Sequence, residues 1–471
     1  MSSVKREGTP LRSVTPPRKR FKQSESHSST KIKVETTEYG SEWADWPAPR
    51  QQMKEARAFI MDIIENRRSV LIVPDKDADG LSAGTLLYQT LVHLGLEPSR
   101  ISVHHLSKGT NVHSDAERDK MAVFGADKIV VLDQGSRPGR AILPSLEEDE
   151  KRVLIIDHHM SDEWPENSQV LTACHTSPIA TASLLTYMML RELHPSVIEQ
   201  ESWRAIVGVV GDLGTTVAKW GVPPWPSELG DVTKRVGAKS ISDAVAGINA
   251  PRRTAEYNVP KAWGIILDAK SPSQIASNAF LKLCKLDVQA ETEKWARTPP
   301  RFSEDGRVAV VTVDTGFQVH PVIATRWAGT LGKKSKKLIM IMCANTSFNP
   351  DPAKISFSCR IASGLRSLPD DERPNLIALL NEYADSIEGF RERVGGDYAR
   401  GHKEATGGII AKTEFALLLQ AMGVPSADSP RKPPTPKGTK RKVLDPTQTT
   451  GIKDFFKTLP PKEPTVKSEI K

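Results

Sequence analysis

Several apolar runs of this sequence end in aspartate or histidine. LIVP leads into DKDADG, KIVVL into DQG, RVLII into DHH, and the hydrophobic stretch AIVGVVG into DLG. The residues at these ends are Asp75, Asp77, Asp79, Asp133, Asp157, His158, His159 and Asp212. A lone aspartate at such a place is most simply a helix cap or a turn former. The repetition of the pattern favours one shared site instead.

Divalent cations are the expected occupants of such a site. Carboxylates held close together repel one another and raise each other's pKa unless cations neutralise them. Oxygen ligands joined by imidazoles suit Mg²⁺ or Mn²⁺, and the imidazoles favour Mn²⁺. Two such ions would activate a water and stabilise the leaving oxygen of a phosphoryl displacement. We therefore expect a two-ion site for phosphoester hydrolysis.

The elements that carry these residues have the pattern of an α/β domain. The runs LIVP, ISV, KIVVL and RVLII are short and apolar at consecutive positions, as in strands buried on both faces of a parallel sheet. LSAGTLLYQTLVHLG, ASLLTYMMLREL and WRAIVGVVGDLG have helical spacing. Ligands of open parallel sheets lie beyond the carboxyl ends of the strands. Residues 45–270 are thus expected to form one domain with the site at that edge.

The rest of the chain is expected to contain a connecting helix, a smaller α/β domain and two tails. Residues 271–300 look like the connecting helix, and residues 301–424 alternate again between strand-like and helix-like runs. Residues 1–44 and 425–471 are rich in Ser, Thr, Pro and Lys and lack apolar periodicity, so we expect them to be disordered.

The net charge of +8 is concentrated in the tails. Residues 1–35 hold nine Lys and Arg against three Asp and Glu, and residues 429–471 hold eleven against four. The middle of the chain is therefore mildly acidic, which fits a carboxylate-rich site. No stretch reaches the roughly 18 apolar residues of a membrane helix, so we expect no membrane partner. The four scattered cysteines are expected to be buried free thiols.

The motifs resemble those of the DHH phosphoesterase family, and within it the RecJ-like nucleases. DKDADG, VVLDQG, IIDHH and VVGDLG resemble the first four motifs of the family. The resemblance implies that the metal ligands are Asp77, Asp79, Asp133, Asp157 and Asp212, with Asp75 and His158 completing the shells. It also implies that His159 faces the scissile phosphate and acts with Asp157 and His158. One branch of the family has a histidine where this chain has Val73, and Asp75 supplies the RecJ-type alternative.

Two further segments resemble nucleic-acid-binding elements of the same family. INAPRR resembles the Asn-Ala-x-Arg segment at the end of the first domain. In the second domain SFSCRIASG resembles a Ser-x-Arg-Ser element, and RGHKEATGG resembles the Gly-Gly-His motif, with Arg400 in place of the usual first glycine. The binding residues implied are Arg252, Arg253, Ser358, Arg360, Gly401, His402, Gly407 and Gly408. The resemblance covers roughly residues 68–415.

The C-terminal tail carries a possible docking segment at residues 448–457. Ile452, Phe455 and Phe456 stand at i, i+3 and i+4 in TQTTGIKDFFK, and one helical turn would place them on one face. The segment resembles the box that binds the sliding clamp PCNA, with Thr449 where glutamine is usual. Docking onto the protein's own core is the alternative. The basic clusters PPRKRFK and PKGTKRKV predict a nuclear location.

The sequence thus predicts a nuclear, metal-dependent phosphodiesterase that hydrolyses single-stranded nucleic acid as an exonuclease, with Mn²⁺ or Mg²⁺ as cofactor and PCNA as partner. Two alternatives stay open. The same site could hydrolyse short oligonucleotides or a dinucleotide. The chain could also be a non-catalytic replication scaffold of the DHH family, against which the intact aspartate set argues.

Overall fold

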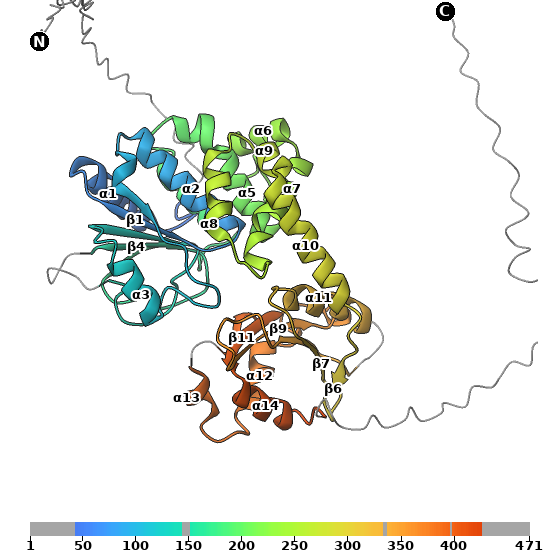
Figure 1. Cartoon of the computed structure of the whole chain (residues 1–471). Coiled ribbons are helices and arrows are strands. Elements are labelled where there is room, and N and C mark those ends of the chain that lie inside the picture. Colours follow the sequence, from blue (N-terminus) through green and yellow to red (C-terminus); the bar gives the residue numbers. More distant parts are fainter. Residues whose placement is uncertain (1–42, 144–150, 333–336, 396–397, 426–471) are drawn as a thin grey trace, which may run out of the picture.

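A computed structural model describes residues 43–143, 151–332, 337–395 and 398–425. Two sheets, each with hydrophobic cores of its own, lie toward opposite ends of a long helix (Figure 1). Both predicted tails fall almost wholly outside the described residues, as does the PCNA-box-like segment 448–457. Among the described helices, none has the length and apolar character needed to cross a membrane.

The first sheet is parallel throughout, which confirms the predicted fold class. Its strand order is β2-β1-β3-β4-β5. The strands are β1 (Val70–Pro74), β2 (Ile101–Val103), β3 (Lys128–Leu132), β4 (Val153–Asp157) and β5 (Ser168–Thr172). The strand order reverses between β1 and β3, so the segments that follow these two strands pass to opposite faces of the sheet. Such a place at the carboxyl edge is where open α/β sheets bind ligands.

Both faces of this sheet are covered. Val70 and Ile72 of β1 point to one core, which the helices α1, α2, α4, α5, α7 and α8 complete, and Leu71 and Val73 point to another, which includes Met121 of α3. This alternation explains why the strands are apolar at consecutive positions. The helices are α1 (Arg50–Glu65), α2 (Ala78–His93), α3 (Asp115–Ala122), α4 (Ala182–Leu190), α5 (Ser202–Leu213), α6 (Ser227–Val236), α7 (Ala238–Ile248) and α8 (Val259–Asp268).

The N-terminal edge of the first domain lies slightly before the predicted residue 45. Trp46 is buried in the larger core, and Trp43 packs against that core. The packed part of the first domain thus begins close to the predicted residue 45. The indole rings of Trp46 and Trp225 meet edge to face at 5.7 Å, which anchors this first segment.

Two helices, instead of the single predicted one, connect the sheets. They are α9 (Pro272–Ser277) and α10 (Ala279–Trp295), and α10 runs from one sheet region to the other (Figure 1). Asn278 separates them, because its extended backbone ends α9 and its side chain accepts a hydrogen bond from the amide of Leu281 to cap α10.

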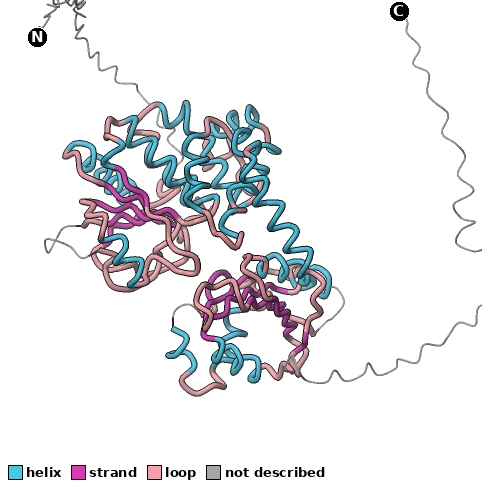
Figure 2. Tube along the Cα trace, in the orientation of Figure 1, coloured by secondary structure: helices cyan, strands magenta, loops and turns pink. Residues whose placement is uncertain are grey.

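The second sheet, whose strands are the lower magenta group in Figure 2, is mixed. Its strand order is β10-β11-β9-β8-β7-β6. Only the β7–β8 pair is parallel. The strands are β6 (Arg301–Phe302), β7 (Val308–Val313), β8 (Met340–Asn345), β9 (Lys354–Ile361), β10 (Arg400–His402) and β11 (Ala405–Ala411). The helices are α11 (His320–Leu331), α12 (Leu376–Ala384), α13 (Phe390–Val394) and α14 (Lys412–Ala421).

Helix α11 packs on one face of this sheet, and α12 and α14 pack on the other. Single turns of 3₁₀ or π helix occur at η2 (Pro98–Arg100), η3 (Val197–Glu201), η4 (Pro251–Arg253) and η5 (Ser363–Leu365). All four cysteines are buried and free, as predicted.

Candidate metal centre

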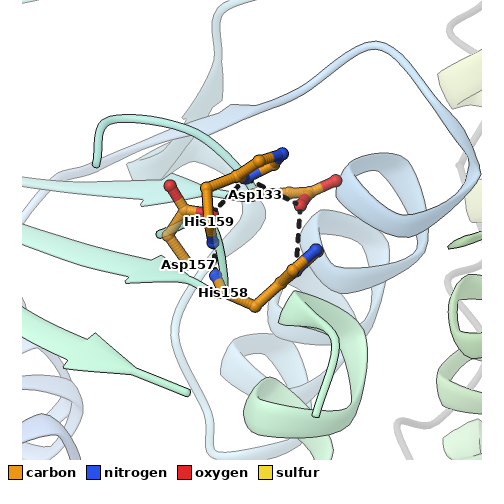
Figure 3. Close-up of side chains that lie close together, drawn as sticks. All are labelled: Asp133, Asp157, His158 and His159. Atoms are coloured by element: carbon orange, nitrogen blue, oxygen red, sulfur yellow. Dashed lines mark hydrogen bonds and ion pairs between the residues drawn. The ribbon is translucent and has the colours of Figure 1, made fainter. Parts of the chain in front are cut away.

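The predicted acidic and histidine residues meet at the carboxyl ends of β1, β3 and β4. Figure 3 shows Asp133, Asp157, His158 and His159 turned toward one another at this edge. The described part of the chain has three groups of potential metal ligands, and within each group the ligand atoms lie within 4.8 Å of one another. The groups are Asp133, Asp157, His158 and His159; Asp79, Asp133, His158 and Asp212; and Asp75, Asp77 and Asp133. Asp133 belongs to all three, so it occupies the centre of the cluster.

Asp133 has a strained backbone and a buried carboxylate oxygen without a hydrogen-bond partner. Its backbone has a φ of 62°, in the left-handed region that most residues avoid. Its side chain is buried, and Oδ1 has no hydrogen-bond partner. Burial, and then the charges of Asp79, Asp77, Asp212 and Asp157, raise the pKa of Asp133 well above the usual range. Strain and an unsatisfied charge at one residue are typical of a site built for a ligand.

Asp157, in contrast, is well satisfied. Its Oδ1 accepts hydrogen bonds from the amides of His158 at 2.8 Å and His159 at 3.2 Å, and its Oδ2 accepts one from the amide of Ser136 at 3.1 Å. The His159 ring adds a contact from Nδ1 at 2.7 Å. Burial would raise the pKa of Asp157, but the bond from His159 and these other donors outweigh it and the pKa is lowered. Asp157 therefore ties the end of β4 to the loop after β3.

The two histidines are stacked, with ring centroids 4.7 Å apart, but they face different surroundings. His158 is buried, with Nε2 3.1 Å from Asp212 Oδ2 and Nδ1 3.5 Å from Asp133 Oδ1. The side chain of His159 is half exposed. Burial lowers the pKa of His159, but its bond to Asp157 prevails and raises the pKa to about 9. His158 thus belongs to the buried cluster, and His159 faces the open side.

Asp77 and Asp79 also cap helices. Asp77 is the N-cap of α2 and accepts hydrogen bonds from the amides of Asp79 and Gly80. Asp79 lies at the N-terminus of α4, where it accepts from the amides of Ala182 at 2.7 Å and Ser183 at 3.1 Å. Burial and then Asp212 raise the pKa of Asp79 to about 6. Asp77 and Asp79 therefore act as helix caps and also belong to the groups of potential metal ligands.

Asp212 reaches the cluster on helix α5 and not on a strand. The close approach of α5 depends on Gly208, where an added Cβ would lie 2.1 Å from Ser183 Oγ and 2.5 Å from Asp79 Oδ1. A helix that passes this near can place Asp212 opposite the strand ends. The GVVGDLG stretch thus contains both the glycine that allows the close packing and a potential metal ligand.

Cationic side chains lie beside the carboxylates of Asp75 and Asp77 and offset part of their negative charge. Lys76 Nζ lies 3.1 Å from Asp75 Oδ1, and Arg252 Nη2 lies 3.7 Å from Asp77 Oδ2. Burial would raise the pKa of Asp77, but Arg252 and the Gly80 amide lower it. Arg252, expected on the strand-binding surface, is thus placed beside Asp77. The neighbouring Arg253 is partly buried, and desolvation and then Arg252 lower its pKa to about 10.

The donor set fits hard divalent cations. Asp133 Oδ1 and His158 Nδ1 are buried without a hydrogen-bond partner, and both face the cluster. Carboxylate oxygens with one or two imidazoles are the ligands expected for Mn²⁺ or Mg²⁺. Asp133 could contribute to two ions, with His158 and Asp212 on one side and Asp75 and Asp77 on the other. The geometry therefore supports a cluster that could hold metal.

The second domain forms the opposite wall of the cleft at this cluster. A cleft of about 300 Å³ is lined by Asp75, Asp133, Asp157 and His159 on one side and by Arg400, Gly401 and His402 on the other. A neighbouring cleft of about 420 Å³ is lined by the other predicted binding residues of the second domain, namely Ser358, Arg360, Gly407 and Gly408. The structure thus divides the predicted strand-binding residues between two adjoining clefts.

Several lining residues were not predicted from the sequence. His113, Asn111, Ser136 and Met160 line the metal-centre cleft, and His320 and Phe348 line its neighbour. Their segments carry no run of chemically distinctive residues, so composition and spacing gave no signal. His104 and His105 are packed, His104 against Glu117 at 2.7 Å and His105 against the Trp263 ring.

Comparison with known proteins supports the motif assignment. Residues 69–208 match the profile of the DHH family, N-terminal domain. Residues 69–208 thus resemble the N-terminal domain of the DHH family. Over 181 residues it is 25% identical to the single-stranded-DNA-specific exonuclease RecJ of Thermus thermophilus, a match that covers 37% of this chain and 26% of RecJ.

Solved RecJ structures share the fold. The crystal structure of Thermus thermophilus RecJ in complex with Mn²⁺ gives a TM-score of 0.56 at 20% identity, over 80% of this chain and 55% of that one. A structure of exonuclease RecJ bound to manganese gives a TM-score of 0.52 at 19% identity, over 79% of this chain and 93% of that one. The chain spans about a quarter of the length of the curated relative and just over half of the first structure.

Proposed function

We propose that this protein is a metal-dependent phosphodiesterase that hydrolyses single-stranded nucleic acid from an end. The observation that carries this proposal is the position of the Asp133-centred cluster. It lies at the point where the strand order reverses, inside a cleft whose other wall is His402 and Arg400 of the second domain. A carboxylate cluster that could hold cations, opposite the guanidinium of Arg400, suits a phosphodiester, which is anionic and needs charge neutralisation.

Different residues of the chain would hold the cations, position those ligands and contact the phosphate. Bound divalent cations would activate water and neutralise charge on the phosphate. Asp75, Asp77, Asp133, His158 and Asp212 would hold those cations, with Asp79 and Asp157 fixing the helix and strand ends around them. His159, held through Nδ1 by Asp157, presents its other ring nitrogen on the open side. That nitrogen would donate a hydrogen bond to a phosphate oxygen.

The neighbouring cleft would hold the strand by its backbone. Arg360 Nη1 donates to Ser358 Oγ at 2.8 Å and to the carbonyl of Cys359 at 2.8 Å, which fixes one side of the guanidinium. Gly407 and Gly408 on β11 line the cleft and, because they have no side chains, leave its backbone accessible. An added Cβ at Gly407 would lie 2.4 Å from the carbonyl oxygen of Phe357. Fixed guanidinium donors beside exposed backbone are typical of phosphate recognition.

Two observations from relatives support the same function. The relative with sequence similarity is a single-stranded-DNA-specific exonuclease, and the two RecJ structures contain manganese. Substrates of different sugar and length distinguish DNA from RNA and a long strand from a dinucleotide.

Purified full-length protein on end-labelled substrates tests the proposal. Single-stranded DNA, single-stranded RNA, duplex DNA and a dinucleotide would be incubated with Mn²⁺, Mg²⁺ or EDTA. The proposal expects cation-dependent release of short products from a single strand. Cleavage of the dinucleotide alone would support the short-substrate alternative, and no cleavage of any substrate would support the scaffold.

Substitutions in the second domain are expected to weaken substrate binding more than turnover. Arg360→Ala and His402→Ala each remove a contact made alike in the ground state and the transition state, so KM should rise about tenfold with kcat little changed. Steady-state kinetics on a single strand measures both constants. Arg391→Ala is a matched control, because Arg391 is exposed on α13 and pairs with Asp385. Unchanged KM in both variants would place the strand elsewhere.

We further propose that the protein acts in the nucleus and is recruited by PCNA through residues 448–457. A peptide covering residues 445–460 is expected to bind PCNA, and Phe455→Ala with Phe456→Ala is expected to abolish this binding. Truncating buried aromatic anchors commonly costs about 2 kcal/mol or more, roughly 30-fold in affinity. Calorimetry measures both peptides.

Thr449→Gln provides the matched gain-of-affinity variant, because it restores the glutamine usual at that position of the box. Hydrolysis of free oligonucleotides should be unaffected by the double Phe substitution. No heat of binding at high micromolar peptide would exclude the clamp, and a loss of thermal stability on deleting the tail would favour docking on the protein's own core.

A further inference from the structure

A turn of the first domain lies against the second domain. It runs from Ser107 to Thr110, and we call it the bridging turn. The amide of Thr110 closes it by donating a hydrogen bond to the carbonyl oxygen of Ser107 at 3.2 Å. Gly109 has a φ of +77°, which favours glycine, and an added Cβ there would lie 2.8 Å from Nδ2 of Asn349 in the second domain. Lys108 therefore stands at the tip of a turn that directly adjoins the other domain.

Lys108 donates hydrogen bonds to carbonyl oxygens of both domains. Its Nζ lies 2.7 Å from the carbonyl oxygen of Gly316, between β7 and α11, and 3.1 Å from that of Ala255, which follows η4. The same ammonium lies over the ring of Phe348, between β8 and β9, at 4.6 Å from the ring centroid. An ammonium has three donors and no acceptor, so carbonyl oxygens and an aromatic face suit it. One charged group thus joins the bridging turn to three segments that are far from it along the chain.

The base of the bridging turn is fixed within the first domain. The amide of Ser107 donates to Glu117 Oε1 at 3.3 Å, and Lys120 Nζ donates to Ser107 Oγ at 2.6 Å. Glu117 and Lys120 both belong to α3. The turn is therefore held at its base by α3 and at its tip by the second domain.

Lys108 strengthens a contact that the backbone also makes. The amide of Gln318 in the second domain donates to the carbonyl oxygen of Arg253 in the first at 2.8 Å. An added Cβ at Gly316 would lie 3.1 Å from the Cβ of Ala255, so these two segments touch where Lys108 binds both. The Lys108 side chain is half-buried, and burial lowers the pKa of Lys108 although Glu256 opposes this shift. Hydrogen bonds from a charged donor gain strength where water is partly excluded.

The bridging turn also borders the path proposed for the substrate. Thr110, its last residue, and the following Asn111 line both the metal-centre cleft and the neighbouring cleft of Ser358 and Arg360. Gly109 lines the neighbouring cleft as well. A shift of the turn away from the second domain would therefore change both clefts together.

We propose that Lys108 is a positioning residue that fastens the bridging turn to the second domain and so keeps the two clefts aligned for one strand that passes through both. The fastening follows from the contacts alone, whereas its effect on strand binding rests on the proposed function. The apparent affinity of a ligand falls in proportion to the fraction of protein in the binding-competent arrangement. Loss of Lys108 would lower that fraction without removing any group that holds a cation or a phosphate.

Lys108→Met tests the effect on the strand, because it removes the charge and the donors and keeps the apolar stem. KM for a single strand is expected to rise about tenfold, or about 1.4 kcal/mol, with kcat within about twofold of wild type. Fluorescence anisotropy of a labelled strand in EDTA should show the same factor in Kd. Lys108→Arg keeps a charged donor and should restore most of the affinity. Calorimetric binding of Mn²⁺ should be unchanged in both variants.

Hydrogen–deuterium exchange of the strand-free protein tests the fastening itself. The amides of Thr110 and Gln318 should exchange faster in Lys108→Met than in wild type, and Lys108→Arg should slow them again. Weaker strand binding with unchanged exchange would mean that Lys108 contacts the strand directly, and would overturn the inference. Faster exchange with unchanged KM and Kd would overturn it too, because the turn would then not position the clefts.

Lys261→Met is the matched control. Lys261 is exposed on α8, its Nζ lies 4.0 Å from the centroid of the Phe280 ring on α10, and it lines neither cleft. The same exchange of residues there removes a similar cation–aromatic contact that does not involve the second domain. We expect wild-type KM and wild-type exchange at Thr110 and Gln318. Equal changes in both Met variants would overturn the role of Lys108.

This inference and the proposed function can fail separately. A wild-type protein that hydrolyses no substrate would overturn the proposed function, while faster exchange and weaker strand binding in Lys108→Met would still support the fastening. A wild-type protein that hydrolyses a single strand, with KM and exchange unchanged in Lys108→Met, would retain the phosphodiesterase and overturn the role of Lys108.

Discussion

Asp133→Asn is expected to abolish hydrolysis and, at the same time, to stabilise the metal-free protein. Asp133 is the residue shared by all three groups of potential ligands, so its loss affects every cation. Removing cation assistance costs several kcal/mol of transition-state stabilisation, which corresponds to about 10³-fold or more in rate. Activity on a labelled single strand with saturating Mn²⁺ measures this loss.

The gain in stability has an independent physical cause. Burial and four neighbouring carboxylates raise the pKa of Asp133, so the ionised form is disfavoured in the folded protein. Asparagine has the same shape without the charge. Stabilising substitutions commonly contribute about 0.5–2 kcal/mol, and we expect Tm in EDTA to rise by about 2–6 °C at pH 8.

The pH dependence of that gain follows from the direction of the shift. A carboxyl whose pKa is raised on folding holds its proton more tightly in the folded state, so its contribution to stability falls as the pH rises above the unfolded value. The advantage of Asp133→Asn should therefore be small near pH 4 and larger at pH 8. Asp243→Asn, at an exposed pair with Lys239, is the control. A variant that is less stable than wild type in EDTA would contradict the account of Asp133.

Asp157→Ala is expected to have the opposite effect on stability. Asp157 is buried and accepts hydrogen bonds from the amides of Ser136, His158 and His159. Each buried donor left without a partner costs about 1–3 kcal/mol, so the loss should be about 3 kcal/mol or more. Tm in EDTA should fall by about 6–12 °C, measured by thermal unfolding with circular dichroism.

Both substitutions should abolish activity, so the opposite shifts in Tm distinguish a strained ligand from a structural anchor. Asp157→Asn keeps one acceptor oxygen and should restore part of the stability without restoring hydrolysis. A Tm for Asp157→Ala equal to that of wild type would show that the donors find other partners, and would remove the anchoring role.

The sequence predicted much of the first domain for a simple physical reason. Strands buried on both faces must be apolar at consecutive positions, and RVLII and KIVVL have that pattern. The polar residues that follow such strands can only lie at the carboxyl edge. β5 was missed because it begins with Ser168 and Gln169 and is only partly buried.

What the sequence did not predict depends on packing across long distances. The close approach of α5 to Asp79 depends on Gly208, where an added Cβ would lie 2.5 Å from Asp79 Oδ1. The placement of Arg252 against Asp77 and the convergence of Arg118, Arg140 and Arg400 on one pocket depend on how loops and domains meet. No local pattern records such contacts, because their partners are far apart along the chain.

Calorimetric titration of the metal-free protein with Mn²⁺ tests the Asp133-centred site most directly. Wild type is expected to bind two ions per chain, and Asp133→Asn is expected to lose tight binding of both, since every group of potential ligands includes Asp133. Unfolding in the same buffers checks that the variant is folded. Two ions bound by Asp133→Asn with wild-type affinity, or no Mn²⁺ bound by the wild type, would contradict the account.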